Sequence, residues 1–198
     1  ASSGPVHTFS VGFEDAHLDE RRAARSVADH LGTVHHEQVV TDADAADVLP
    51  GLVARMDEPL ADYAALPTFL ISRFAAQHVK VVLTGEGADE LFAGYRRYRR
   101  DRVLAPIASL RPAYQASHVF TRRETARLLG RPLSAMTRPP HHARRARGAL
   151  NRLLLRDLEG WLPDDLLVKV DRMTMLCSLE ARVPYLDHEF VEYALALP

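Results

Sequence analysis

A short apolar segment that ends in a glycine-rich, acidic turn constrains the fold of this chain more than any other feature. Residues 79–83 are mostly β-branched and show no polar alternation, which is typical of a parallel strand covered on both faces. Thr84-Gly85-Glu86-Gly87 follows, and a helix is expected from Ala88. Glycines allow a ligand to approach the backbone, and the first amides of a helix lack partners. We therefore expect this turn to bind a phosphate or a carboxylate.

Three carboxylates beside the turn, those of Glu86, Asp89 and Glu90, would repel a phosphate unless a positive charge lies between them. Mg²⁺ is the expected ion, because it prefers carboxylate oxygens and shares them with the phosphates of a nucleotide. The alternative interpretation is that these acids only favour the positive end of a helix, which stabilises it by about 0.3–1 kcal/mol each.

The first half of the chain alternates between strand and helix patterns, which indicates a parallel sheet flanked by helices. In one helix, Gly32 is the expected C-terminal stop, and Ala24, Val27, Ala28 and Leu31 form the expected apolar stripe. After residue 100 no convincing strand pattern is found, and five prolines interrupt helix patterns, so the second half is expected to be all-helical. The predicted strands cover residues 6–11, 35–40 and 79–83, and the predicted helices cover residues 19–31, 43–56, 67–78 and 88–99.

Composition excludes several classes of protein. The 198 residues suit one domain, and 25 basic against 26 acidic residues give no net field to attract nucleic acid or a membrane. No apolar run approaches the ~20 residues of a membrane span, so we expect a cytoplasmic protein. The single cysteine, Cys177, lies in a predicted helical run from Asp171 to Ala181, where a buried apolar role is favoured over a nucleophile.

Other histidines, basic residues and apolar residues are interpreted as structural, with no binding or catalytic role. The basic stretch 138–147 contains two histidines but no aromatic residue for base stacking and no further metal ligand, so it is interpreted as a surface loop. His35 and His36 are interpreted as a strand end. Met173, Met175, Leu176 and Leu179 are interpreted as core residues.

The segment from residue 79 to residue 95 resembles the synthetase domain of glutamine-dependent asparagine synthetases at every position of that family's pattern. Other blocks agree with the family in the same order along the chain, and the match weakens only from about residue 99 to residue 161. These blocks are residues 7–13, 28–37, 57–62, 162–175 and 179–187.

The resemblance implies a Rossmann-like fold of the adenine nucleotide alpha hydrolase type, with residues 1–99 as the nucleotide-binding part and residues 100–198 as the helical part. It also implies ATP-dependent amidation of aspartate through an aspartyl-adenylate, with ammonia derived from glutamine. By position, Val11, Thr84 and Gly85 would bind ATP, Glu86 would act at the adenylate step, and Asp89 would bind Mg²⁺.

Five further positions are implied to face the substrate: Tyr95, Lys169, Asp171, Glu180 and Arg182. Lys169 and Asp171 would orient the carboxylate and the amine of the substrate. Glu180 and Arg182 precede Pro184, which restricts the residue before it. If they are buried, charged groups there need partners, so a structural network between the sheet and the helices is favoured over direct substrate contact.

The sequence departs from the family in one serious respect. The Ser-Gly-Gly-x-Asp-Ser pyrophosphate loop, the strand before it, the family's later lysine segment and the glutaminase domain do not occur in these 198 residues. We expect the missing strand to be a central one, and its absence to leave an exposed apolar sheet edge. The isolated chain is thus expected to bind ATP weakly and to show no detectable aspartate-dependent pyrophosphate release.

Three functions remain open at this stage. In the first, the chain is part of an asparagine synthetase. In the second, it is part of another enzyme on the same scaffold, such as a β-lactam synthetase or an amidotransferase for another carboxylate. In the third, it is a non-catalytic module. A homodimer is compatible with each of these.

Overall fold

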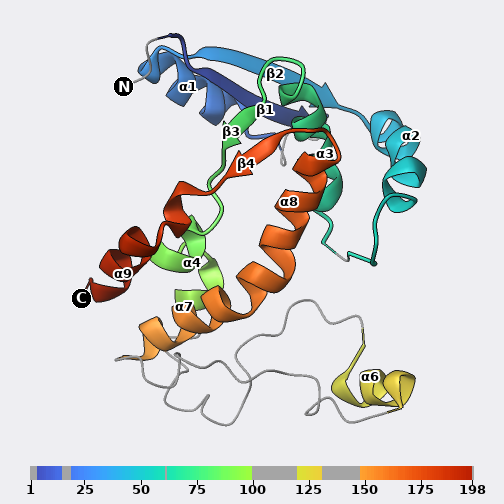
Figure 1. Cartoon of the computed structure of the whole chain (residues 1–198), viewed down its shortest axis with the longest axis vertical. Coiled ribbons are helices and arrows are strands. Elements are labelled where there is room, and N and C mark those ends of the chain that lie inside the picture. Colours follow the sequence, from blue (N-terminus) through green and yellow to red (C-terminus); the bar gives the residue numbers. More distant parts are fainter. Residues whose placement is uncertain (1–3, 15–18, 61, 100–119, 131–147, 198) are drawn as a thin grey trace. The chain divides into compact units, whose positions relative to one another are not determined.

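The computed structural model describes residues 4–14, 19–60, 62–99, 120–130 and 148–197, and Figure 1 shows its elements. The chain forms two compact units, which we describe separately. Unit 1 comprises Ala1–Thr84 and Asp165–Pro184, and unit 2 comprises Gly85–Asp164 and Tyr185–Pro198. The expected boundary between residues 99 and 100 falls where the described residues stop, so it stays a prediction. So does the loop assigned to residues 138–147, which lies outside the described residues.

Unit 1 contains two pairs of parallel strands. β1 (His7–Phe13) pairs with β2 (Val34–Val40), and β3 (Val81–Leu83) pairs with β4 (Glu180–Arg182). The predicted parallel α/β class is confirmed, but the described strands make two small sheets and not one Rossmann-like sheet. β3 is also not covered on both faces, because the side chains of Val81 and Leu83 are exposed.

β4 contradicts the prediction of an all-helical second half. The helical run expected from Asp171 to Ala181 ends early, since α8 spans Leu167–Met175. Ser178 adopts a left-handed φ of 55°, and the amides of Ser178 and Leu179 donate to the carbonyls of Met175 and Thr174, at 3.0 and 3.1 Å. This pair of bonds is a Schellman motif, which closes a helix and frees the next residues for a strand. This helix end was not predicted, because a serine stands at the left-handed position that glycine usually occupies.

The remaining elements of the second half are helical where the structure describes them. They are α6 (Arg122–Leu129), α7 (Ala149–Glu159), a π-helix (Leu162–Leu166), a 3-10 turn (Pro184–Leu186) and α9 (His188–Ala196). Within the described ranges, none of the helices has both the length and the apolar character needed to cross a membrane.

Helices α1 (Arg21–Leu31) and α3 (Ala65–Ala75) lie on opposite faces of the β1–β2 pair. Arg25 of α1 pairs with Glu37 on one face, whereas Phe74 of α3 packs edge-on against Phe9 on the other. Gly12 permits the close approach of α1, because a Cβ at this position would collide with the side chain of Arg21.

Local signals in α1 and α2 (Asp42–Val53) are partly confirmed. Gly32 ends α1 in a left-handed conformation, as predicted. The apolar stripe of α1 is wrong, because only Ala28 is buried, while Val27 and Leu31 are exposed. Thr41 caps α2 through a reciprocal pair of hydrogen bonds with Asp44, which satisfies two amides that the helix leaves unpaired.

The core of unit 1 forms where α3 and α8 lie side by side (Figure 1). Met173 is fully buried against Leu52 and Ala65, and Leu176 packs at the edge of this cluster. Leu179 is also buried, so the prediction of a core position is confirmed for Met173, Leu176 and Leu179. It is wrong for Met175, which is 55% exposed on the outer side of α8.

Candidate functional site

The ten residues predicted to form the site fall in both units. Val11, Thr84, Lys169, Asp171, Glu180 and Arg182 belong to unit 1, whereas Gly85, Glu86, Asp89 and Tyr95 belong to unit 2. Each group is described within its own unit, and the convergence of all ten on one site stays a prediction.

Thr84 continues the β3–β4 ladder by one residue, because its amide donates to the carbonyl of Arg182 at 2.9 Å. Its hydroxyl Oγ1 is buried and has no hydrogen-bond partner among the described residues. An unpaired buried hydroxyl costs about 1–3 kcal/mol, and an oxygen of a bound ligand could remove that cost. Ligands of parallel α/β sheets bind at the carboxyl ends of the strands, where Thr84 lies. The position of Thr84 therefore fits a nucleotide, and half-buried Val11, near the same end of β1, fits it also.

Glu180 and Arg182 point to one side of β4 and form an ion pair of 2.8 Å between Glu180 Oε1 and Arg182 Nε. Their side chains are 54% and 63% exposed. The predicted buried network between sheet and helices is therefore wrong, because alternate residues of this edge strand project into solvent. Contact with a substrate stays a prediction for both.

Lys169 has a partner that the sequence analysis did not assign. Its ammonium lies 2.9 Å from Asp62 Oδ2, and the two side chains are only 7% and 11% exposed. Asp62 Oδ1 also accepts the amide of Ala64 at 2.8 Å, just before α3 begins. The pair ties α8 to the start of α3, so a substrate contact of Lys169 would have to compete with Asp62. Asp62 stands in the motif 57–62, but nothing in its spacing pointed to Lys169.

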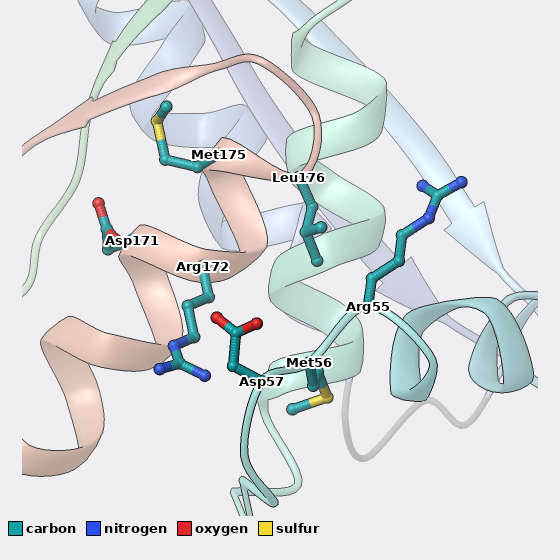
Figure 2. Close-up of a pocket in the computed structure, with 7 residues that line it drawn as sticks. All are labelled: Arg55, Met56, Asp57, Asp171, Arg172, Met175 and Leu176. Carbon is teal, nitrogen blue, oxygen red and sulfur yellow. The ribbon is translucent and has the colours of Figure 1, made fainter.

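Asp171 lies beside a pocket of about 240 Å³ in unit 1 (Figure 2). Arg172 and Asp57 point into the space between α8 and the segment before α3, while the carboxylate of Asp171 points to the outer side of the helix. Arg172 Nη2 donates to Glu58 Oε1 at 3.1 Å. The pocket is lined by Arg55, Met56, Asp57, Asp171, Arg172, Met175 and Leu176.

The acidic turn opens unit 2 and differs from its predicted form. α4 spans only Ala88–Phe92, because Ala93 takes a left-handed φ of 57° and the amide of Gly94 bonds back to the carbonyl of Asp89. The helix predicted over residues 88–99 is thus interrupted, because residues 93–95 are not helical and residues 96–99 are helical again. The five-residue helix α4 gives little dipole for an anion. Gly87 begins it at a φ of 92°, and a Cβ there would lie 2.3 Å from Leu186.

The three acids of this segment differ in their surroundings. Glu86 is half-buried, Asp89 is exposed with its carboxylate against Gly94, and Glu90 is 1% exposed. Within the described ranges, no three acidic, histidine or cysteine side chains converge to hold a metal ion. Magnesium at Asp89 would need its other ligands from phosphates and water, so the ion stays a prediction.

Tyr95 lies in a packed cluster of aromatic and charged side chains within unit 2. Its hydroxyl donates to Glu90 Oε1 at 2.7 Å, and burial together with this carboxylate raises the pKa of the phenol far above its usual value. The guanidinium of Arg97 lies 4.9 Å from the Tyr95 ring centre and 4.5 Å from that of Trp161. Arg97 also pairs with buried Asp157 at 2.8 Å. Sequence patterns gave no signal for this cluster, because Asp157 and Trp161 lie some sixty residues from Tyr95.

The chain is an α/β protein with parallel strands, and one strand ends in a buried hydroxyl and a glycine turn, at the carboxyl end where parallel sheets commonly bind ligands. Comparison with known proteins narrows the class. The chain matches the Asparagine synthase family model over residues 1–198. The chain therefore belongs to the asparagine synthase family.

Several curated relatives agree with this assignment. A Mycobacterium bovis protein named "Putative asparagine synthetase [glutamine-hydrolyzing]" is 34% identical over 96% of this chain and 35% of its own length. "Asparagine synthetase [glutamine-hydrolyzing] 1" of Bacillus subtilis is 30% identical over 98% of this chain and 37% of its own. The Saccharomyces cerevisiae protein of the same printed name is 29% identical over 96% of this chain and 26% of its own. The chain thus spans between about a quarter and somewhat more than a third of the length of these relatives.

Proposed function

We propose that the chain is the synthetase part of a longer enzyme that converts aspartate to asparagine with ATP and ammonia. The observation that carries this proposal is the match to the family along the whole chain, including the Thr84–Gly87 turn. The relatives' printed names include glutamine hydrolysis, which supports glutamine as the ammonia source through a glutaminase domain. A cytoplasmic location and a homodimer belong to the same proposal.

The proposed reaction has two balanced steps. A side-chain carboxylate oxygen of aspartate attacks the α-phosphorus of ATP, the bond to the β,γ-phosphates breaks, and pyrophosphate leaves. Ammonia then attacks the carbonyl carbon of the aspartyl-adenylate, the acyl–oxygen bond breaks, and AMP leaves with that oxygen. The attacking nitrogen must lose a proton, and a carboxylate within hydrogen-bond distance can accept it.

Within this proposal, the chain's own residues bind the nucleotide and transfer the proton. Val11 packs on the adenosine, while Thr84 Oγ1 and the backbone of Gly85 contact the nucleotide. Thr84 is supported by its buried, unpartnered hydroxyl. Glu86 accepts the proton, because its carboxylate lies in the turn that follows Thr84 and a carboxylate within hydrogen-bond reach of the attacking amine can act as a general base. Asp89 would hold Mg²⁺ on the leaving pyrophosphate.

The five remaining positions would bind aspartate. The pocket beside Asp171 carries both arginine and aspartate side chains, so its charges suit an amino acid with a carboxylate and an ammonium group. Exposed Glu180 and Arg182 are accessible to a ligand. Lys169 and Tyr95 are proposed with a condition, because Lys169 must leave Asp62 and Tyr95 must leave Glu90 before either binds substrate.

The test is Glu86→Gln in the native protein that carries these residues, with Glu192→Gln as the control. Glu192 is an exposed acid of α9 in the same unit. We expect Glu86→Gln to reduce aspartate-dependent asparagine formation about 10²–10⁴-fold, the usual contribution of a general base. Glu192→Gln should leave the rate unchanged. Equal rates for both variants, or a native protein that forms no asparagine, would contradict the proposal.

A further inference from the structure

Five aromatic rings from β1, β2 and the end of α3 contact one another, some stacked and some edge-on. We name them the histidine cluster: His7, Phe9, His36, Phe74 and His78. The ring of His36 lies nearly parallel to those of His7 and Phe9, with centres 5.1 and 5.0 Å away. The ring centre of His78 lies 4.2 Å from that of His36. The cluster thus fastens the turn after α3 to both strands.

The hydrogen bonding in the cluster depends on protonation. His7 Nδ1 lies 2.8 Å from His36 Nε2, and one of these nitrogens must donate while the other accepts. A neutral imidazole has one donor and one acceptor nitrogen, whereas a protonated imidazole has two donors. If both rings are protonated, two N–H groups face each other and the bond is lost.

The charges around His36 oppose its protonation. Burial is the largest cause that lowers the pKa of His36, followed by the neighbouring imidazoles of His78, His7 and His35. The carboxylate nearest in sequence, Glu37, lies on the other face of β2, where it pairs with Arg25 and with His35 Nε2 at 3.2 Å.

The charged side chain of α3 next to the cluster is engaged elsewhere. Arg73 lies over the ring of Phe69 at 5.9 Å from its centre, and its charge acts on Asp44 at the start of α2. Neither Arg73 nor Glu37 is among the groups that act on His36. A second proton in the cluster would therefore meet like charges.

We propose that His7, His36 and His78 form an acid-sensitive clasp that holds the end of α3 on the β1–β2 pair at neutral pH and loosens it as the pH falls below about 6.5. The clasp lies three residues before β3, the strand that ends at Thr84. Its opening would loosen the segment that leads into the candidate site. The inference does not depend on the proposed reaction, because it concerns only the packing of unit 1.

The direction of the effect follows from linkage. His36 binds protons less readily in the folded chain than in the unfolded chain, whose histidines titrate near pH 6.5. The stabilisation is therefore complete above pH 6.5 and is lost as the pH falls from there toward the lower folded pKa. Each extra proton bound on opening can change the opening equilibrium by about tenfold per pH unit at most.

The experiment follows two signals by NMR in the 198-residue chain between pH 7.5 and 5.5. The first is the titration of the His36 imidazole Cε1–H signal. The second is hydrogen-exchange protection of the amides of Gln77, His78 and Val79, which bond to carbonyls of α3. The reference amides are those of Leu176 and Cys177 at the end of α8, which donate to the carbonyls of Arg172 and Thr174. Protection is corrected for the intrinsic pH dependence of exchange.

We expect the His36 midpoint below about 6.5, and protection at residues 77–79 to fall up to about tenfold per pH unit while the reference amides stay constant. His36→Phe keeps an aromatic ring and should abolish the pH dependence at residues 77–79. The control is His30→Phe, which changes an exposed histidine on α1 and should leave the pH dependence at residues 77–79 unchanged.

Two results would overturn the clasp. One is a His36 midpoint at or above 6.5 in the unchanged chain, which requires no variant to fold. The other is a loss of protection at residues 77–79 that is equal in the reference amides or persists in His36→Phe.

Discussion

The buried pair between Lys169 and Asp62 supports a prediction that separates structural from substrate-binding roles. Lys169→Met keeps the length and apolar stem of the side chain but removes its charge. Asp62 would then keep the amide of Ala64 as a partner but lose the ammonium 2.9 Å away. Breaking a buried ion pair by removing one partner costs about 3–5 kcal/mol.

The size of this loss makes the assay decisive. A small protein unfolds in urea with a slope of about 1–3 kcal/mol per M, so a loss of about 3 kcal/mol lowers the unfolding midpoint by about 1–3 M. Far-UV circular dichroism of the chain and its variants would measure it. Lys169→Met combined with Asp62→Asn should recover part of the loss, because the amide oxygen still accepts from Ala64 while no charge is left unpaired.

Arg172 and Glu58 provide a matched control. They link the same helix to the same segment, but their side chains are 27% and 64% exposed. Arg172→Met should therefore cost no more than about 1 kcal/mol. If Lys169→Met costs as little as Arg172→Met, the Lys169–Asp62 pair contributes nothing, and the ammonium of Lys169 is available for a substrate after all.

Three further predictions test local structure. Gly87→Ala should destabilise unit 2 by about 1–3 kcal/mol in thermal unfolding, because its φ of 92° is strained for any residue with a Cβ and the new Cβ would lie 2.3 Å from Leu186, and no loss of stability would contradict the left-handed conformation at Gly87. Ser178→Gly should stabilise the chain by about 0.5–1 kcal/mol, since glycine adopts the left-handed φ of 55° without strain, and a destabilised variant would refute the helix end seen here. Hydrogen bonds from Thr41 hold the pKa of Asp44 below its usual value, so its contribution is complete above about pH 4 and is lost below it; Asp44→Asn should flatten the pH dependence of unfolding there, and an unchanged curve would contradict the cap.

The elements predicted well are those fixed by local chemistry. Gly32 ended its helix as expected, because only a residue that tolerates positive φ closes a helix in this way. The strand starting near His7 and the one ending at Leu83 were also expected from their apolar, β-branched residues. The parallel pairing of β1 with β2 followed from the alternation of strands and helices along the chain, whereas the partner of β3 was not predicted.

The wrong helix ends arose where residues other than glycine adopt a left-handed conformation. Ser178 and Ala93 take left-handed conformations that glycine usually marks, so the sequence concealed both the end of α8 and the early end of α4. β4 was missed for the same reason. Its alternating charged residues, Glu180 and Arg182, suit an exposed edge strand.

Long-range partners explain what the sequence left open in the site. The motif around Thr84 could be recognised because its residues are contiguous. Lys169 pairs with a residue more than a hundred positions earlier, and Tyr95 packs against Trp161. Such contacts depend on tertiary packing, which neither periodicity nor spacing reports.

The central claim, ATP-dependent amidation through an aspartyl-adenylate, is tested most directly by isotope transfer in the native protein that carries these residues. Aspartate labelled with ¹⁸O in its side-chain carboxylate is converted in the presence of ATP and ammonia, and the AMP is analysed by mass spectrometry. Our account predicts one ¹⁸O atom in the AMP, because the attacking carboxylate oxygen stays on the α-phosphorus when ammonia displaces it. Unlabelled AMP, or ¹⁸O in inorganic phosphate together with ADP, would contradict the account.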